Sequence, residues 1–509
     1  MTVRVASASE TVACERATMA KGVESAELMT RAGHAAAVFI QERCADRLGN
    51  GAIVFAGSGN NGGDGWVVAE SLAKAGVPVA VVSATGPRSH EAMTARERAM
   101  NAGVTVGEGN GGECLVIDAL LGTGSSGAPR GEIANAIGEV HARQADGAYV
   151  VSLDVPSGLD ATTGAHEGAV AADLTVSFGT LKRGHLISRE PCGEVVVVDI
   201  GLADDGEMRS LPLLVDSEWV VSRIPPIPAD AHKGTRKRLA IVGGGPGLAG
   251  AVILAGEAAL RSGIGLLRIV ASPVNAVAIQ ASVPGALFQE WPANPPDLDN
   301  LARASDVIAI GPGLGNSPET RDLVQRILLA WRGPVVIDAD ALNVFAGDTD
   351  SLAKLLNGRP SIITPHPAEM GRLLNMRTDE VLANRFEIGI DLAKKLRGAV
   401  LLKGTPTVVF SPDGSRHVSA VGTAALATGG SGDMLTGIAS TLFGQTSGSE
   451  VTPGEIAACA AFVHGRASEL CEFVRGTTLD DILAMLPLAF NDRPASIASA
   501  ILAEVASRR

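Results

Sequence analysis

The stretch AIVFAGSGNNGGDGWVVAESLAKAG, residues 52–76, decides the fold class of the first half of the chain. Its opening run, Ala52–Gly57, is rich in apolar residues and predicts a buried strand. In its closing run, Val67–Gly76, the apolar residues have the spacing of an amphipathic helix. A glycine-rich turn, GSGNNGGDG at residues 57–65, joins the two. A strand, a glycine turn and a helix in this order indicate a parallel α/β layer.

The same alternation recurs along the chain. Three more runs of the first half predict strands: CLVIDAL (Cys114–Leu120), YVVSLDVP (Tyr149–Pro156) and DLTVSFG (Asp173–Gly179). Six runs of the second half predict strands: Arg238–Gly243, Leu266–Ser272, Asp306–Gly311, Pro334–Ala339, Ser361–Pro365 and Ala399–Gly404. Acidic and proline residues interrupt the pattern between them, so we predict a boundary near residues 205–225. The sequence thus predicts two α/β domains, residues 1–212 and 213–509, with a helical closing segment at Thr477–Arg509.

Composition excludes several classes of function. The 509 residues carry 42 Lys and Arg against 55 Asp and Glu, a net charge of −13, with no basic run that would bind nucleic acid or an anionic membrane. Six scattered cysteines form neither a C-x-x-C pair nor a zinc spacing, so we expect them to be reduced. The amino-terminal residues lack the apolar block of a signal peptide, and glycines break the uncharged stretch Ala240–Gly256. We therefore expect a cytoplasmic protein.

Three polar loops of the first half follow predicted strands. They are residues 57–65, 118–131 and 154–164, and the carboxyl ends of parallel strands are where open α/β sheets bind ligands. Glycines let the first loop approach a phosphate, and the helix after it offers free N–H groups to an anion. Asn61, Asp118, Asp154 and Ser157 offer hard oxygen atoms that suit an alkali or alkaline-earth cation. The alternatives are an ordinary glycine turn and aspartates that only cap helices.

The motifs GSGNNGGDG, DALLGTG, DVPSGLDATTG and DLTVSFGTLKRGHL, in this order, resemble the Rossmann-like amino-terminal domain of the NAD(P)H-hydrate epimerases. The resemblance implies that two loops hold the hydrated dinucleotide: Asn60, Asn61, Gly62, Gly63 and Asp64, and Gly122, Thr123, Gly124, Ser125, Ser126, Gly127 and Ala128. It implies that Asn61, Asp118 and Ser157 bind potassium. It also implies that Asp154 contacts the substrate, with Lys182 opposite it.

Epimerisation at a ring carbon that carries a hydroxyl requires either transient ring opening or loss of hydroxide. Both routes need an acid/base group within hydrogen-bond distance. Asp154 and Lys182 are the predicted catalytic pair. Without the resemblance, Lys182 could equally be a solvated loop lysine.

The second half carries its own set of motifs: GPGLG (Gly311–Gly315), DADALN (Asp338–Asn343), TPHPAEM (Thr364–Met370), LLKGTPTVV (Leu401–Val409) and ATGGSGDML (Ala427–Leu435). The last motif predicts a helix that begins at about Gly432 and holds Asp433 in its first turn. N–H groups at residues 430–432 would stabilise charge on a transferring phosphoryl group, and Asp433 would take a proton from a hydroxyl nucleophile. The alternative is an acid that only favours the helix dipole.

This second set resembles the ribokinase-like dehydratase domain of bifunctional NAD(P)H-hydrate repair enzymes. The resemblance implies that Ala251, Gly313, His366 and Asp433 contact the hydrated cofactor. It implies that the adenine nucleotide is held by Lys403, Gly404, Thr405, Pro406, Thr407 and Gly432. Bacterial members of the family use ADP and eukaryotic ones ATP, with magnesium in either case. We also expect a homo-oligomer.

The expected chemistry follows from hydroxide being a poor leaving group. Phosphorylation of the ring hydroxyl makes phosphate the leaving group, with Asp433 as the base. His366 would hydrogen-bond the substrate or be a loop histidine without a role, His464 is expected to be structural, and the roles of Asp340 and Asn343 stay open. Two departures from the family pattern are the loop GGGPGLAGA (Gly243–Ala251) and Pro406.

Two other functions are compatible with these motifs. One is a ribokinase-like small-molecule kinase with an accessory dinucleotide-binding domain, which would release a stable phosphorylated product. The other is a nucleotide sensor, which would have no need of the acid/base residues Asp154, Lys182 and Asp433. The leading interpretation is a repair enzyme of two activities, which first interconverts the R and S hydrates of NADH or NADPH and then dehydrates the S form.

Overall fold

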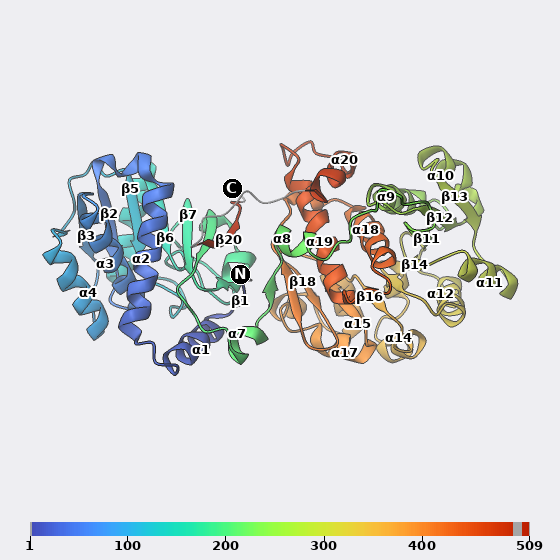
Figure 1. Ribbon diagram of the computed structural model, residues 1–509, viewed down its shortest axis with the longest axis horizontal. Coiled ribbons are helices and arrows are strands. Elements are labelled where there is room, and N and C mark those ends of the chain that lie inside the picture. The colour runs from blue at the N-terminus through green and yellow to red at the C-terminus, as the bar shows by residue number, and fades with distance from the viewer. Residues whose placement is uncertain (1–2, 492–500, 508–509) are drawn as a thin grey trace. The chain divides into compact units, whose positions relative to one another are not determined.

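The computed structural model describes residues 3–491 and 501–507. The chain divides into two compact units, the first comprising Met1–Leu213 and the last residues of the chain, the second beginning at Leu214 (Figure 1). Each unit is a layered arrangement of helices on a mostly parallel sheet, as the sequence predicts. No helix in the described part of the chain is long and apolar enough to cross a membrane. None of the six cysteines, all of which lie in the described residues, forms a disulfide bond.

The first unit is built on an eight-stranded sheet with the order β20-β9-β7-β6-β5-β2-β3-β4. Its strands are β2 (Ala52–Ala56), β3 (Val79–Ser83), β4 (Thr105–Val106), β5 (Leu115–Ala119), β6 (Tyr149–Leu153), β7 (Leu174–Phe178), β9 (Glu194–Val198) and β20 (Ile501–Val505). All neighbours pair in parallel except β20, which is antiparallel to β9. A separate parallel pair joins β1 (Val5–Ala6) to β8 (Leu181–Lys182).

Helices cover both faces of this sheet, which is why the strands β2, β5 and β7 are buried along their whole length. The helices are α1 (Ala8–Met19), α2 (Ser25–Arg43), α3 (Asn60–Lys74), α4 (His90–Asn101), α5 (Gly131–Ala145), α6 (Arg183–Ile187) and α7 (Gly206–Ser210), with 3-10 turns at Ala45–Asn50 and Glu190–Cys192. One core cluster joins α2 and α3 to the sheet, and it includes Trp66, Leu72 and Ile117. The other joins α5 to the opposite face through Ile137 and Phe55.

The second unit is built on a ten-stranded sheet with the order β10-β19-β18-β17-β16-β15-β14-β11-β12-β13. Its strands are β10 (Leu213–Leu214), β11 (Arg238–Val242), β12 (Leu266–Ala271), β13 (Ala286–Glu290), β14 (Val307–Ile310), β15 (Val335–Ile337), β16 (Ser361–Ile363), β17 (Ala399–Leu402), β18 (Thr407–Phe410) and β19 (Arg416–Ser419). The strands from β13 to β17 are parallel, and β17, β18 and β19 form an antiparallel meander.

The helices of the second unit are α8 (Ser217–Val221), α9 (Ala249–Arg261), α10 (Ala276–Ser282), α11 (Pro295–Arg303), α12 (Pro318–Ala330), α13 (Asp340–Asn343), α14 (Thr349–Leu356), α15 (Pro367–Leu374), α16 (Thr378–Ala383), α17 (Ile390–Leu396), α18 (Ser431–Gln445), α19 (Pro453–Glu469) and α20 (Leu479–Ala489), with 3-10 turns at Pro273–Asn275 and Ala424–Leu426. Helices α9 and α18 pack closely because Gly437 has no side chain: a Cβ there would lie 2.1 Å from the Ala255 carbonyl oxygen. This contact joins the middle of α18 to the middle of α9.

The structure corrects the sequence analysis in two places. Helix α3 begins at Asn60, not near Val67, so the residues of NNGGD are helical and not part of a loop. The closing segment is not helical throughout: α20 ends at Ala489, and residues 501–505 form strand β20 in the sheet of the first unit. Every strand predicted in the two halves is present, and the additional strands are β1, β3, β4, β8, β9, β10, β13, β18, β19 and β20.

Candidate functional site

A buried ion pair lies at the carboxyl edge of the first sheet. Asp154 directly follows β6, its φ is 63°, and its backbone N–H donates to the Val176 carbonyl. Its carboxylate forms an ion pair with the Nζ of Lys182, which is fully buried. The structure therefore brings together the two residues that the sequence analysis paired.

The lysine is held by more than the aspartate. Its Nζ donates to Ser177 Oγ at 3.0 Å and to the carbonyls of Phe178 and Thr180 at 3.1 and 3.2 Å. Its backbone lies on β8, in register with Ala6 of β1. Lys182 is thus positioned by the fold and is not a solvated loop lysine.

Asp154 is ionised in spite of its burial. Burial alone would raise its pKa, but the charge of Lys182 and the hydrogen bonds from Lys182 and Thr123 outweigh that effect and lower it. Thr123 donates both its hydroxyl and its backbone N–H, the latter at 3.3 Å. The adjacent His185 is buried, and burial followed by the charge of Lys182 lowers its pKa to about 3, so it is neutral.

A second carboxyl group of this site, that of Asp64, has a raised pKa. Asp64, the fifth residue of α3, is 9% exposed, and no hydrogen bond to its carboxyl group is found in the described part of the chain. Burial, then the charges of Asp154 and Glu15, raise its pKa well above the ordinary value. Opposite pKa shifts of two carboxyl groups within one site are typical of sites that exchange protons. Glu15 of α1 was not singled out from the sequence, because a single acid on a helix gives no signal.

Of the residues predicted to bind potassium, Ser157 contacts the buried carboxylate of Asp118, and Asn61 contacts the loop that follows it. Asp118, fully buried at the end of β5, accepts from Ser157 Oγ at 2.5 Å, Ser157 N at 2.9 Å and Ser152 Oγ at 2.8 Å. Burial raises its pKa against the effect of these hydrogen bonds. Asn61 Nδ2 donates to the Leu121 carbonyl at 2.8 Å, whereas its Oδ1 is buried without a partner among the described residues.

Two glycines bring the two predicted substrate segments of the first unit together. A Cβ at Gly62 would lie 2.0 Å from the Gly57 carbonyl oxygen, so only glycine lets α3 start this close to β2. A Cβ at Gly122 would lie 2.9 Å from the Asn61 Cβ, so the loop after β5 abuts the first turn of α3. The loop itself is partly exposed, and Ser125 closes it by donating to the Gly122 carbonyl.

The second unit has a comparable site at the carboxyl edge of its own sheet. Helix α18 begins at Ser431 after Gly430, whose φ of 100° only glycine adopts freely, and Asp433 lies in its first turn. Burial, then the nearby charge of Asp338, raises the pKa of Asp433 to about 7, although Lys403 opposes the shift. A carboxyl group with this pKa can accept and release a proton at neutral pH.

Two residues without a predicted role organise this second site. Asp338 follows β15 and is 1% exposed; it accepts from Lys403 Nζ at 2.7 Å and from Thr436 Oγ1 at 2.6 Å. Glu369 lies 3.8 Å from the same Nζ. Burial opposes the charged form of Lys403, but the two acids outweigh it and raise the pKa of Lys403. Both acids stand in motifs quoted from the sequence, but only their spatial partners reveal their function.

The predicted nucleotide loop is the turn of a hairpin. Residues 403–406 connect β17 to the antiparallel β18, which begins at Thr407, and the peptide between Thr405 and Pro406 is cis. The Thr405 carbonyl accepts from Arg385, and Thr407 Oγ1 donates to the Gly404 carbonyl at 3.0 Å. The loop meets α18 directly, because a Cβ at Gly432 would lie 3.2 Å from the Nζ of Lys403.

The predicted contacts to the hydrated cofactor fall in two places. Ala251 and Gly313 are adjacent, since a Cβ at Gly313 would lie 3.0 Å from the Ala251 Cβ. His366 caps α15, where its Nδ1 accepts from the N–H of Ala368 at 3.1 Å. Burial and then the charge of Lys403 lower its pKa, so the imidazole is neutral. The imidazole is half-exposed and lies 3.5 Å from Glu369, so it faces the Lys403 network.

Three other residues named from the sequence have structural partners. Asp340 accepts from the Gly315 N–H at 2.8 Å, and Asn343 accepts from Arg372 of α15 at 3.0 Å, so each residue holds a neighbouring segment. His464 is buried in α19, and burial lowers its pKa to about 4. Its neutral ring fits the structural role expected for it. In the described residues, no group of three or more His, Cys, Asp or Glu could hold a metal ion.

Both units are parallel α/β domains with titratable residues at the carboxyl edge of the sheet. This architecture is typical of enzymes that bind nucleotides. The family profile described as "YjeF-related protein N-terminus" matches residues 25–184, and the one described as "NAD(P)H-hydrate dehydratase" matches residues 239–487. The chain is 35% identical to the bifunctional NAD(P)H-hydrate repair enzyme Nnr of Moorella thermoacetica, over 91% of this chain and 92% of the relative.

A second relative with the same name, from Escherichia coli, is 34% identical over 92% of this chain and 90% of its own. A solved structure of the ADP/ATP-dependent NAD(P)H-hydrate dehydratase from Bacillus subtilis is 29% identical and covers 54% of this chain and 96% of its own, with a TM-score of 0.46. The chain belongs to the family of bifunctional NAD(P)H-hydrate repair enzymes, which confirms the resemblance of both halves.

Proposed function

We propose that the first unit interconverts the R and S hydrates of NADH and NADPH, with Asp154 and Lys182 as its catalytic pair. The hydrated ring carbon carries a hydroxyl group and a ring nitrogen. When the ring opens, the hydroxyl loses its proton as the carbon–nitrogen bond breaks, and the nitrogen gains one; re-closure on the other face reverses both transfers. The ionised carboxylate of Asp154 supports its role as the base.

Two segments of the first unit would hold the dinucleotide. The start of α3, from Asn60 to Asp64, presents N–H groups and a helix dipole that favour a phosphate. The loop from Gly122 to Ala128 would close over it from the end of β5, and Thr123 already contacts the catalytic Asp154. The direct contact between these two segments supports a single substrate site.

Potassium fits the oxygen atoms of Asn61, Asp118 and Ser157. The unpaired, buried Oδ1 of Asn61 is the observation that supports a cation, because a buried polar atom without a partner is costly. A bound potassium ion supplies positive charge and fixes oxygen ligands. Asn61 and Ser157 would then tie the start of α3 to the loop after β6, which positions Asp154.

Replacement of potassium by tetramethylammonium is expected to lower the epimerisation rate several-fold, because the larger cation cannot be coordinated by these oxygens. The rate of R-to-S conversion at constant ionic strength measures this. The matched control is Asn61→Ala, whose rate should be low and no longer depend on the cation. A wild-type rate that is equal in both salts would contradict the potassium site.

The second unit would dehydrate the S hydrate at the expense of an adenine nucleotide. Asp433 takes the proton of the ring hydroxyl as its oxygen attacks the terminal phosphorus of the nucleotide, and loss of phosphate then restores the dihydronicotinamide ring. The carboxyl group of Asp433 in the first turn of α18, with a pKa of about 7, is the observation that carries this proposal. The N–H groups of residues 430–432 and the ammonium of Lys403 would stabilise charge on the transferring group.

We propose ADP as the nucleotide, held by residues 403–407 and Gly432, with magnesium on its phosphates. Magnesium binds oxygen ligands through one or two carboxylates and the phosphates of the nucleotide. Asp340 and Glu369, whose charges both act on Asp433, would supply such oxygens. The ion neutralises phosphate charge and helps the nucleotide to react.

Product analysis tests this function directly. The S hydrate with ADP and magnesium is expected to yield NADH, AMP and inorganic phosphate in equal amounts. A stable phosphorylated hydrate without NADH would instead identify a kinase. The same assay with ATP in place of ADP determines the preferred phosphoryl donor.

The pH dependence of dehydration is expected to report Asp433. Because only the ionised carboxylate accepts a proton, kcat/KM should rise about tenfold per pH unit below pH 7 and level off above it. Epimerisation is the internal control: the pKa of Asp154 is lowered, so its ionisation should not limit that rate in the same range. A dehydration rate that is constant between pH 5.5 and 8 would contradict the role of Asp433.

Two expectations from the sequence stay predictions. A cytoplasmic location agrees with the substrates of the family, and cell fractionation would test it. Assembly into a homo-oligomer follows only from the resemblance, and sedimentation velocity of the full chain would test it.

A further inference from the structure

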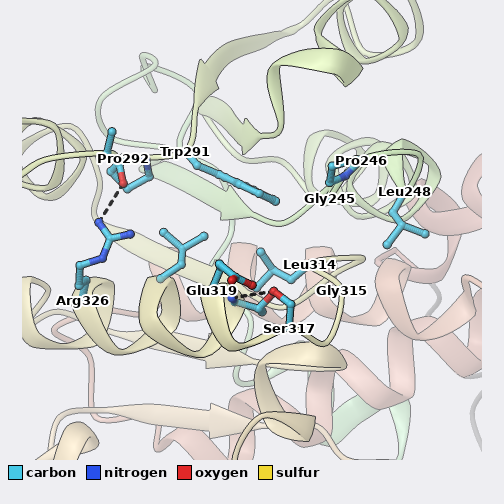
Figure 2. Close-up of a pocket in the computed structure, with 13 residues that line it drawn as sticks. Gly245, Pro246, Leu248, Trp291, Pro292, Leu314, Gly315, Ser317, Glu319 and Arg326 are labelled. Carbon is cyan, nitrogen blue, oxygen red and sulfur yellow. Dashed lines mark hydrogen bonds between the residues drawn. The ribbon is translucent and has the colours of Figure 1, made fainter.

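The second unit has a cavity of about 450 Å³ that none of the acid/base residues enters. Its walls are the loop after β11, the loop after β14, the start of α12 and the residues that follow β13 (Figure 2). Most of its lining is apolar, and it includes Leu248, Trp291 and Leu314. Both the size and the lining are typical of a site for a small organic ligand.

The indole of Trp291 forms a rigid flat wall of this cavity. Its Nε1–H donates to the Gly243 carbonyl at 2.9 Å, which fixes the plane of the ring. Figure 2 shows the ring extended across the cavity above Leu314 and Glu319. The following residue is fixed as well, because Arg326 of α12 donates to the Pro292 carbonyl at 3.1 Å. An aromatic face held in this way is suited to stacking on a planar base.

The cavity is continuous with the predicted cofactor contacts. Leu248 and Leu314 both line the cavity. Leu314 follows Gly313 in the chain, and Gly313 lies against Leu248 and Ala251. The strands β11, β14 and β15 are neighbours in the sheet, so the loops after β11 and β15 are about 10 Å apart along one edge. The reacting ring at Asp433 and a second group in this cavity can therefore belong to one elongated ligand.

The order of strands separates this cavity from the predicted nucleotide loop. The nucleotide loop, residues 403–407, follows β17, on the far side of β15 and β16 from β11. A co-substrate held by that loop would occupy the opposite end of the edge. The remainder of the hydrated dinucleotide, which ends in adenosine, would then extend from Asp433 towards β11 and β13.

We propose that this cavity binds the adenosine end of the hydrated dinucleotide, with its adenine stacked on Trp291. This rests on the proposed dehydration at Asp433 and extends it to a substrate-recognition residue. The Glu319 carboxylate in the same wall would accept hydrogen bonds from the ribose hydroxyls. The hydrogen bond from Ser317 lowers the pKa of Glu319, so this acceptor is ionised.

The test compares two substrates that share the reacting ring. One is the S hydrate of NADH, and the other is the corresponding hydrate of reduced nicotinamide mononucleotide, which has no adenosine. Trp291→Ala is expected to raise KM for the dinucleotide by about 5- to 150-fold, the effect of losing one base–aromatic stack. The kinetics of the mononucleotide should not change, and Trp291→Phe should restore most of the affinity for the dinucleotide.

Three results would overturn the proposal. They are an unchanged KM for the dinucleotide in Trp291→Ala, an equal loss of affinity for both substrates in Trp291→Phe, and a wild-type enzyme with the same KM for the two substrates.

A second measurement does not depend on the alanine variant: NAD+ should quench the indole fluorescence of the wild type, whereas nicotinamide mononucleotide should not. Equal quenching of the wild type and Trp291→Phe by NAD+ would also overturn it. Turnover of the mononucleotide hydrate by the wild type tests the dehydration itself, so failure of the cavity proposal and failure of the reaction are distinguishable.

Discussion

Asp433→Asn is expected to reduce the kcat of dehydration by about 100- to 10,000-fold, the range for loss of a positioned general base. The amide has the shape of the carboxyl group but cannot accept the proton of the ring hydroxyl. The fold should be retained, because the substitution removes a carboxyl group whose charged form is disfavoured by burial. The measurement is NADH formation from the S hydrate with ADP and magnesium.

Epimerisation supplies the control for this variant. Asp433 and Asp154 belong to different compact units, so R-to-S conversion by Asp433→Asn should equal that of the wild type. A folded Asp433→Asn protein that loses both activities would show that the two reactions are not divided between the units as we propose. One that dehydrates at the wild-type rate would remove Asp433 from the mechanism.

The second large effect is expected from Asp154→Asn, which should lower the epimerisation rate by about 100- to 10,000-fold. The ionised oxygen that takes the hydroxyl proton is lost. The ammonium of Lys182 keeps its hydrogen bonds to Ser177, Phe178 and Thr180, so the variant should remain folded. In a mixture of both hydrates, the S form should be consumed and the R form should accumulate unconverted.

Lys182→Met is the matched comparison for this pair. It leaves Asp154 buried without its cation, which typically costs about 3–5 kcal/mol when one partner of a buried pair is removed. We therefore expect a lower thermal midpoint for the first unit in Lys182→Met than in Asp154→Asn. The reverse order of midpoints would show that Lys182, and not Asp154, is the costly member of the pair.

The parts of the fold that follow from local pattern were predictable. Runs such as Ala52–Gly57 are short, apolar and followed by glycine, so both the strands and the carboxyl edge were found from the sequence. Asp154 and Asp433 were found in the same way, because each directly follows a strand or begins a helix. The family profiles support the same two domains.

Features that depend on distant residues were not predictable. The start of α3 at Asn60 was missed because glycines suggest a loop, whereas here Gly57 and Gly62 allow close backbone packing. Strand β20 is recognised only through its pairing with β9. In the sequence, the whole second unit lies between these two strands. Asp338 acquires its function from Lys403 and Thr436, which are 65 and 98 residues away.

The most direct measurement is the recovery of NADH absorbance when the purified protein is added to a mixture of R and S hydrates with potassium, magnesium and ADP. The account predicts complete conversion of both hydrates to NADH. It also predicts that Asp154→Asn stops after the S form is consumed and that Asp433→Asn recovers NADH at least about 100-fold more slowly than the wild type. If the wild type converted only the S hydrate to NADH, that result would contradict the epimerase assignment. A stable phosphorylated hydrate in place of NADH would contradict the dehydratase assignment.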